Sequence, residues 1–224
     1  MTGYTLIRSQ RRTAAIHIKN GGVEVRAPMK MPKADIDRFV ASKEKWITEH
    51  LSQSQLYAEK RKAFELNYGD TVAFRGTEYP LSAKAGNRAR FDGERFYLPP
   101  GCSPEQIKAA VVNIYRLLAK QHLTLRVEHF AKLMGTSPKN IKINGAKTRW
   151  GSCSAKKSLN FSWRLVMAGD AVIDYVVCHE LAHIIEMNHS ARFWAVVESI
   201  LPDYKERQKR LKELQKRLNA EDWE

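Results

Sequence analysis

The chain has 224 residues, of which 43% are hydrophobic and 28% are charged. This hydrophobic share excludes intrinsic disorder, and the length is enough for one well-packed domain or two small ones. No apolar run approaches the roughly 20 residues that a membrane-spanning helix needs, so we expect no membrane segment.

The chain is strongly basic, with 38 Lys and Arg against 24 Asp and Glu and a net charge of +14. A positive surface raises the local concentration of anions whatever their identity, so nucleic acid, nucleotides and acidic proteins are all candidate partners. A solvated surface without an anionic partner is the open alternative. The three cysteines form no C-x-x-C pair, and "MTGYTLIRSQRRTAA" lacks the pattern of a secretory signal, so we expect a cytoplasmic protein.

The first hundred residues carry runs typical of strands. Alternation in "YTLIRS", "AAIHIK" and "GGVEVRAP" predicts three strands, with a hairpin at Gly21-Gly22. A helix is expected from Pro32 or Lys33, and residues 51–64 either continue it or form a second helix. Two hairpins follow in "DTVAFRGTEYPL" and "ARFDGERFYLPP". The breaker Pro99-Pro100-Gly101 ends this region, so we expect a β-rich N-terminal α+β region over residues 1–100.

The second half opens with a long helix. Ser103 is a predicted N-cap, with Pro104 at the first helical position and Gln106 completing a capping box, and the pattern runs to Gly135. Two strand-like runs follow, "NIKINGAKTRWGSCS" and "SLNFSWRLV", around the turn residues of "SAKKS". They predict a β-hairpin.

The stretch "YVVCHELAHIIEMNHSARFW" holds three histidines among apolar residues. His179 and His183 stand four apart, so in a helix they share a face and both rings can touch one ion. Glu180 projects beside them, where its carboxylate can reach a water on the ion without becoming a ligand. This is the arrangement of HExxH zinc hydrolases, and we expect the long helix to lie behind this one.

A third ligand is expected from beyond a bend, because a catalytic zinc site has three protein ligands and an open position. His189 is placed for it, since Asn188 and Ser190 favour a turn followed by the N-cap of a new helix near Ala191. The metal helix itself is expected to begin with Asp170 as its N-cap.

Other histidines and the cysteines have structural interpretations. A lone buried histidine is more often a hydrogen-bonded core residue than a ligand. His122 and His129 share a face of the long helix, but no acid completes a site there, and we interpret both as structural or solvated. Cys178 points about 100° away from its neighbour His179 and is interpreted as core. Cys153 is interpreted as a small buried hydrophobe rather than a reactive thiol.

Three further residues are candidate site residues. Arg149 could hold a carboxylate or phosphate, or stabilise oxyanion charge, with a structural ion pair as the alternative. Trp150 could shield the cleft or stack on a base, with core packing as the alternative. Glu186 could accept a hydrogen bond from a ligand histidine, with an exposed helix charge as the alternative. The tail "DYKERQKRLKELQKRLNAEDWE" predicts an amphipathic closing helix whose charges are interpreted as a solvated face.

Five stretches occur in the order "TRWGSCS", "LNFSWRL", "IDYVVCHELAH", "MNHSARFW" and "PDYKERQKRLK", and together they resemble the YgjP-like family of bacterial zinc hydrolases. A weaker likeness extends to "YGDTVAFRGTEYPL". Glu186 stands where the metzincin pattern requires glycine, which argues against a metzincin. The resemblance implies a metallopeptidase-like domain in which the "TRWGSC" strand lines the cleft beside the metal helix. It also implies a possible nucleotide pyrophosphatase with UTP as the proposed substrate.

We therefore expect an α+β protein with a zincin-like catalytic half over residues 101–224, built from the long backing helix, the β-hairpin, the HExxH helix and C-terminal helices. One Zn²⁺ would be held by His179, His183 and His189, with Glu180 as general base. Three functions stay open: peptide hydrolysis, hydrolysis of a nucleoside triphosphate that brings Mg²⁺ with it, and a DNA-associated module with structural zinc.

Overall fold

The computed structural model describes residues 3–19 and 21–223. The chain forms two compact units, the first of residues up to Phe64 together with Asn219–Asp222, and the second of Glu65–Leu218 together with the C-terminal end. The division therefore lies between Phe64 and Glu65, whereas the sequence placed it at residue 100. Residues 65–100 belong to the second unit because their strands pack on its long helix.

The first unit is a three-stranded sheet covered by two helices. Strands β1 (Thr5–Ser9), β2 (Ala15–Lys19) and β3 (Gly22–Pro28) form the order β1-β3-β2, with β1 parallel and β2 antiparallel to β3. The predicted hairpin is present, and Gly21 turns the chain with a φ of 73°. The predicted helix is two helices, α1 (Lys33–Ala41) and α2 (Glu44–Lys62).

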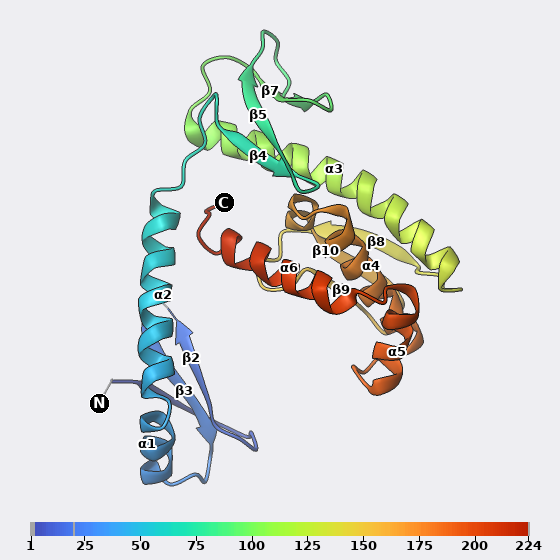
Figure 1. Ribbon diagram of the computed structural model, residues 1–224. Helices are drawn as coiled ribbons and strands as arrows, with labels where there is room; N and C mark the ends of the chain where they lie inside the picture. Colours follow the sequence, from blue (N-terminus) through green and yellow to red (C-terminus); the bar gives the residue numbers. More distant parts are fainter. Residues whose placement is uncertain (1–2, 20, 224) are drawn as a thin grey trace. The chain divides into compact units, whose positions relative to one another are not determined.

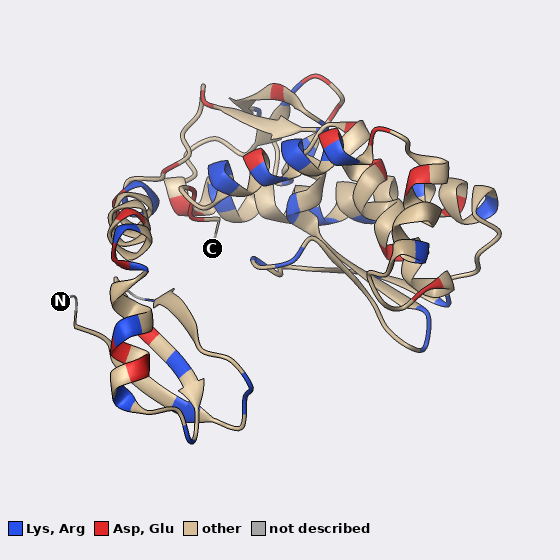
Figure 2. Ribbon diagram, turned by 60° about the horizontal axis from the view of Figure 1, so that its bottom comes forward, with Lys and Arg blue, Asp and Glu red and all other residues tan. Residues whose placement is uncertain are grey.

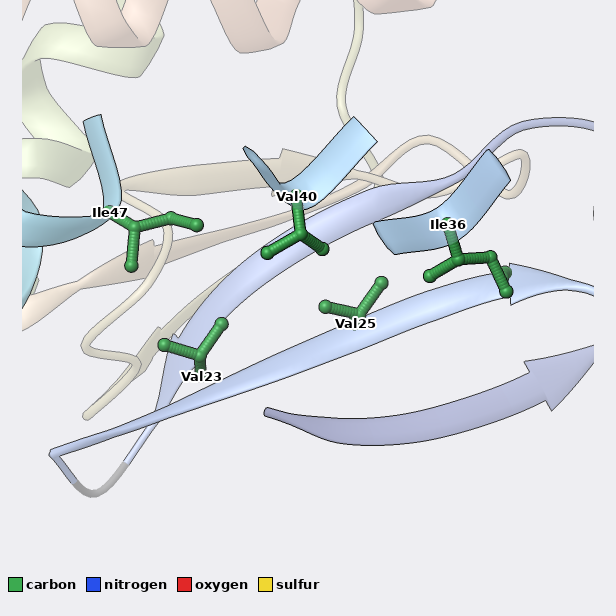
Figure 3. Packing of buried hydrophobic residues seen from close by; sticks show 6 residues of the cluster. Val23, Val25, Ile36, Val40 and Ile47 are labelled. Carbon is green, nitrogen blue, oxygen red and sulfur yellow. The ribbon is translucent and has the colours of Figure 1, made fainter. Parts of the chain in front are cut away.

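The core of this unit follows from alternation on one strand. Side chains on β3 point alternately to the two faces of the sheet, so every second residue meets the helices. Figure 3 shows the aliphatic side chains of β3 facing those of α1 and α2. The buried members are Val23, Val25, Ala27, Ile36, Val40 and Ile47.

The second unit begins with a four-stranded sheet. Strands β4 (Thr71–Phe74), β5 (Thr77–Ala83), β6 (Arg90–Phe91) and β7 (Phe96–Leu98) form the order β4-β5-β7-β6. The two predicted hairpins, β4–β5 and β6–β7, are confirmed, and parallel pairing of β5 with β7 joins them.

Helix α3 (Pro104–Leu133) runs along the second unit (Figure 1). The predicted capping box is present: the Ser103 hydroxyl accepts from the Gln106 amide, and the Gln106 side chain accepts from the Ser103 amide. The Tyr115 hydroxyl donates to the Ala73 carbonyl at 2.6 Å, which fixes α3 to β4. Arg126 of α3 donates two hydrogen bonds, of 2.6 and 2.9 Å, to Asp174 of the helix that carries the histidines. The long helix therefore lies behind the metal helix as expected.

The sheet beside that helix has three strands. Strands β9 (Gly151–Cys153) and β10 (Ser158–Ser162) form the predicted hairpin, whereas β8 (Asn140–Asn144) pairs in parallel with the other side of β10. The prediction of one continuous first strand was wrong. The Asn144 side chain accepts from the Ala146 amide at 3.0 Å, and this local turn diverts the chain at Gly145.

Helices complete the unit. A short 3-10 helix (Trp163–Met167) leads into α4 (Asp170–Ile185), followed by α5 (Ala191–Ile200) and α6 (Tyr204–Leu218). The N-cap of α4 is Gly169 rather than the predicted Asp170, whose carboxylate instead accepts from Arg75. The predicted α+β class is confirmed. Within the described residues, no helix is long and apolar enough to cross a membrane.

Candidate metal centre

Three histidines converge where α4 ends. His179 and His183 lie on one face of α4, which stops at Ile185, and the chain then turns back to His189. Ser190 caps α5 by accepting from the Phe193 amide at 3.4 Å, as the sequence predicted. One ligand atom from each histidine lies within 4.8 Å of the others.

The spacing and chemistry of these rings fit a metal ion such as zinc. The Nε2 atoms of His179 and His189 lie 3.0 Å apart, and two nitrogens bound tetrahedrally at zinc distances would lie roughly 3.3 Å apart. Burial, with the neighbouring rings of His183 and His189, lowers the pKa of His179 to about 4, so this imidazole is neutral near pH 7. A neutral ring is the form that binds a metal. Three imidazoles are a poor site for Mg²⁺, which prefers oxygen ligands.

An aromatic ring of α5 holds the three imidazoles in place. Phe193 is fully buried, and its ring centroid lies 4.9, 4.6 and 4.7 Å from those of His179, His183 and His189. Sequence reasoning assigned no role to Phe193. The sequence "NHSARFW" could have indicated this role, because Phe193 lies three residues after the predicted N-cap and so on the inner side of the new helix.

Glu180 is buried beside the histidines, with 6% of its surface exposed. Its side chain lies directly against the backbone of Gly151 on β9, where an added Cβ would come within 2.6 Å of both Cγ and Oε1. Burial raises the pKa of Glu180 to about 7. A dication bound at the histidines would lower that pKa again by attraction.

A cavity of about 320 Å³ opens next to these groups. Trp150 lines it, together with His179 and Glu180, whereas Arg149 is exposed and is not among the lining residues. Sequence reasoning missed the contribution of α6, whose charges it had interpreted as a solvated face. The further lining residues are Gly151, Tyr175, Val176, Gln208, Leu211, Lys212 and Gln215.

The remaining candidates lie as follows. Glu186 approaches the site through its backbone: its carbonyl oxygen lies 3.4 Å from His183 Nδ1, a long contact. His129 is exposed. His122 is largely buried, with Nε2 at 3.3 Å from an Asp170 oxygen but poorly directed for a hydrogen bond, and burial lowers its pKa.

The two cysteines of this half differ in burial. Cys178 is fully buried, and burial raises its pKa to about 12, as suits a core residue. Cys153 is half-buried on β9, where burial and the charge of Glu180 raise its pKa.

One family model and two solved structures are similar to this chain. The model of the family described as "YgjP-like, metallopeptidase domain" matches residues 12–214. Two solved structures are metallopeptidase zymogens: Pyrococcus abyssi abylysin (24% identity, TM-score 0.38, 41% of this chain and 92% of that one) and Methanocaldococcus jannaschii jannalysin (24%, 0.37, 42% and 95%). No curated protein matches. Because the family model spans most of the sequence, including the histidines and Glu180, the chain belongs to the YgjP-like metallopeptidase-domain family.

Proposed function

We propose that this protein is a zinc-dependent hydrolase in which His179, His183 and His189 hold the ion and Glu180 is the general base. One observation carries the proposal: three imidazole nitrogens lie within 4.8 Å of one another next to Glu180, a buried carboxyl group on α4, and Glu180 and His179 line one cavity. A buried carboxyl group is costly when it forms no ion pair, and Glu180 forms none with any described residue, so its presence here is consistent with a chemical task.

The residues divide the chemistry between them. Zinc, when bound, supplies a Lewis acid and lowers the pKa of water toward 7. Glu180 accepts the proton of the attacking water and returns it to the leaving group, which its pKa near neutrality suits. Gly151 and β9 hold that carboxyl group in place, and Phe193 keeps the imidazoles oriented.

A peptide is the substrate that the surroundings favour. β9 is the edge strand of the order β8-β10-β9, so one side of its backbone is available to pair with an extended chain. It contacts α4 next to the cavity. Triphosphate hydrolysis has less support, since Arg149, its expected phosphate ligand, does not line the cavity.

Zinc content tests the ligand set. We expect close to one zinc per chain, lost on chelation, and strongly reduced in His179→Ala, His183→Ala and His189→Ala. His129→Ala is the control, because His129 is exposed on α3 and away from the triad. Unchanged zinc in the triad variants, measured by atomic emission on purified protein, would contradict the site.

Glu180→Gln tests the base. Glutamine keeps the shape and hydrogen-bonding reach of glutamate but cannot accept a proton, so zinc should stay while hydrolysis falls by roughly 10² to 10⁴. Turnover is measured with unfolded protein and with a nucleoside triphosphate panel with and without Mg²⁺. Full activity of the variant on every substrate would favour structural zinc, as in a DNA-associated module, and triphosphate turnover lost with Glu180 would favour a pyrophosphatase.

A further inference from the structure

One face of α6 forms a wall of the cavity beside the metal centre. Gln208, Leu211, Lys212 and Gln215 are spaced three, one and three residues apart, which places them on a single side of a helix, and all four line the cavity. A different side of α6 is buried through Tyr204, Leu214 and Leu218. Helix α6 therefore buries one side in the core and lines the cavity with another.

The charges on this face differ from those on the rest of α6. Basic residues outnumber acidic ones along α6, whose only acidic residues are Glu206 and Glu213 (Figure 2). The lining face has a single charge, Lys212, flanked by two amides and Leu211. Lys212 is exposed and forms no ion pair with any described residue, although acidic residues of α6 pair elsewhere: Glu206 lies 3.6 Å from Arg210.

The cavity is also lined by Trp150, Val176, His179 and Glu180. The only acidic residue in the lining is Glu180, which is buried at the metal end and reserved by the proposed mechanism. A guest in this cavity therefore meets apolar groups of Trp150, Val176 and Leu211, and the ammonium group of Lys212, which pairs with no described acidic residue. These surroundings match an extended side chain that ends in a carboxylate.

We propose that the α6 face selects peptide substrates with an acidic side chain next to the cleaved bond, and that Lys212 is the residue that determines this specificity. The inference rests on the proposed function, because it assumes that the cleaved bond lies at the histidine triad. Lys212 lines the cavity, so its ammonium group can pair with the carboxylate of a substrate side chain that enters the cavity.

Amino-acid hydroxamates test this without relying on turnover. They join a zinc-chelating group to one side chain, and their binding to zinc-loaded protein is measured by titration calorimetry. The hydroxamate of glutamic acid should bind about tenfold more tightly than that of lysine, with those of leucine and glutamine between them. Lys212→Gln should abolish this order and Lys212→Glu should reverse it. Lys209→Glu is the matched control: it makes the same charge change on α6, and Lys209 does not line the cavity.

Each contrary result has a distinct meaning. Equal affinity for all four hydroxamates, or the same reversal in Lys209→Glu, would overturn the assignment of specificity to Lys212. UTP binding that exceeds that of the glutamic-acid probe and is lost in Lys212→Glu would assign the anionic position to a phosphate and also overturn it. If none of the hydroxamates binds to protein whose zinc content has been verified, the proposed metal-centred hydrolase itself fails.

Discussion

Gly151 and Glu180 form the tightest contact in the site. A Cβ at residue 151 would lie 2.6 Å from Glu180 Oε1 and 2.8 Å from Cδ, closer than atoms can approach. The backbone of Gly151 imposes no left-handed φ, so glycine is needed here for the space it leaves rather than for its conformational freedom. The position of the carboxyl group thus depends on a residue that carries no chemistry of its own.

Gly151→Ala should separate folding from catalysis. The added methyl group meets the flexible end of Glu180, so the side chain moves while the backbone stays, and we expect zinc content to be unchanged and hydrolysis to fall about tenfold to a hundredfold. Ser152→Ala, at the next residue of β9, is the control. Wild-type turnover of Gly151→Ala would show that Glu180 does not need this position.

For individual residues, the sequence predicted the positions that follow from helical spacing and local turns. The shared face of His179 and His183 follows from their separation of four residues, and a turn before His189 follows from Asn188 and Ser190. The contact of Glu180 with Gly151 could not be predicted, since it joins a helix to a strand whose relative placement only tertiary packing sets. The same holds for Phe193 against the three rings.

Among the elements, the start of α4 is fixed by a turn distant in the sequence. Arg75 and Gly76 turn β4 into β5 with φ of 52° and 79°. The Arg75 amide donates to the Val166 carbonyl at 2.7 Å, and its guanidinium donates to Asp170, 95 residues away. A Cβ on Gly76 would come within 2.9 Å of Gly169 Cα, so the turn lies directly on the N-cap of the metal helix.

The Arg75–Asp170 ion pair should make stability depend on pH. Arg75 holds the pKa of Asp170 below its ordinary value of about 3.9, so the pair stabilises the fold above that pH and the contribution disappears as pH falls through the lower, folded-state pKa. Both side chains are nearly half exposed, which limits the contribution to about 0.5–1 kcal/mol. Urea unfolding of Arg75→Ala should show that loss at pH 7 and a shrinking difference below pH 4. A difference that persists at pH 2 would show that packing, not charge, is responsible.

The sequence did not predict the features that depend on how the β4–β5 turn docks onto the start of α4. Asp170 has the residue type of an N-cap, and its side chain was expected to accept from the helix backbone. Arg75 competes for that carboxylate with a charged, two-pronged donor, so the cap passes to Gly169. In α6, likewise, the charge pattern was visible, but which face meets the cavity depends on α4 and β9.

At the scale of the whole molecule, the two units have separate hydrophobic cores. The predicted boundary at residue 100 rested on Pro99-Pro100-Gly101, a strong local breaker. The actual division follows packing instead: β7 packs against α3, with Phe96 on Tyr115, and β4 contacts the 3-10 helix, so the breaker lies inside the second unit. Local signals end an element, but only packing shows which core it joins.

Ile36→Ala should destabilise the first unit and leave the metal centre intact. Ile36 is fully buried between α1 and β3, and its truncation should cost about 2–4 kcal/mol of the free energy of unfolding. Zinc content should not change, because the proposed ligands belong to the second unit. Ile7→Ala, at a side chain 39% exposed on β1, is the control and should have a small effect. Zinc loss in Ile36→Ala would show that the units do not hold their structure independently.

All three histidines proposed as ligands come from the end of one helix and the turn after it, with His179 and His189 only 10 residues apart. Closing so short a loop costs little chain entropy, whereas the carboxyl group of Glu180 is positioned by a strand of a separate sheet. A nascent or partly unfolded chain that has formed α4 and its turn can therefore capture metal before β9 has joined it. Metal capture would then come earlier in folding than catalytic competence, and the ion would help to guide the rest of the second unit into place.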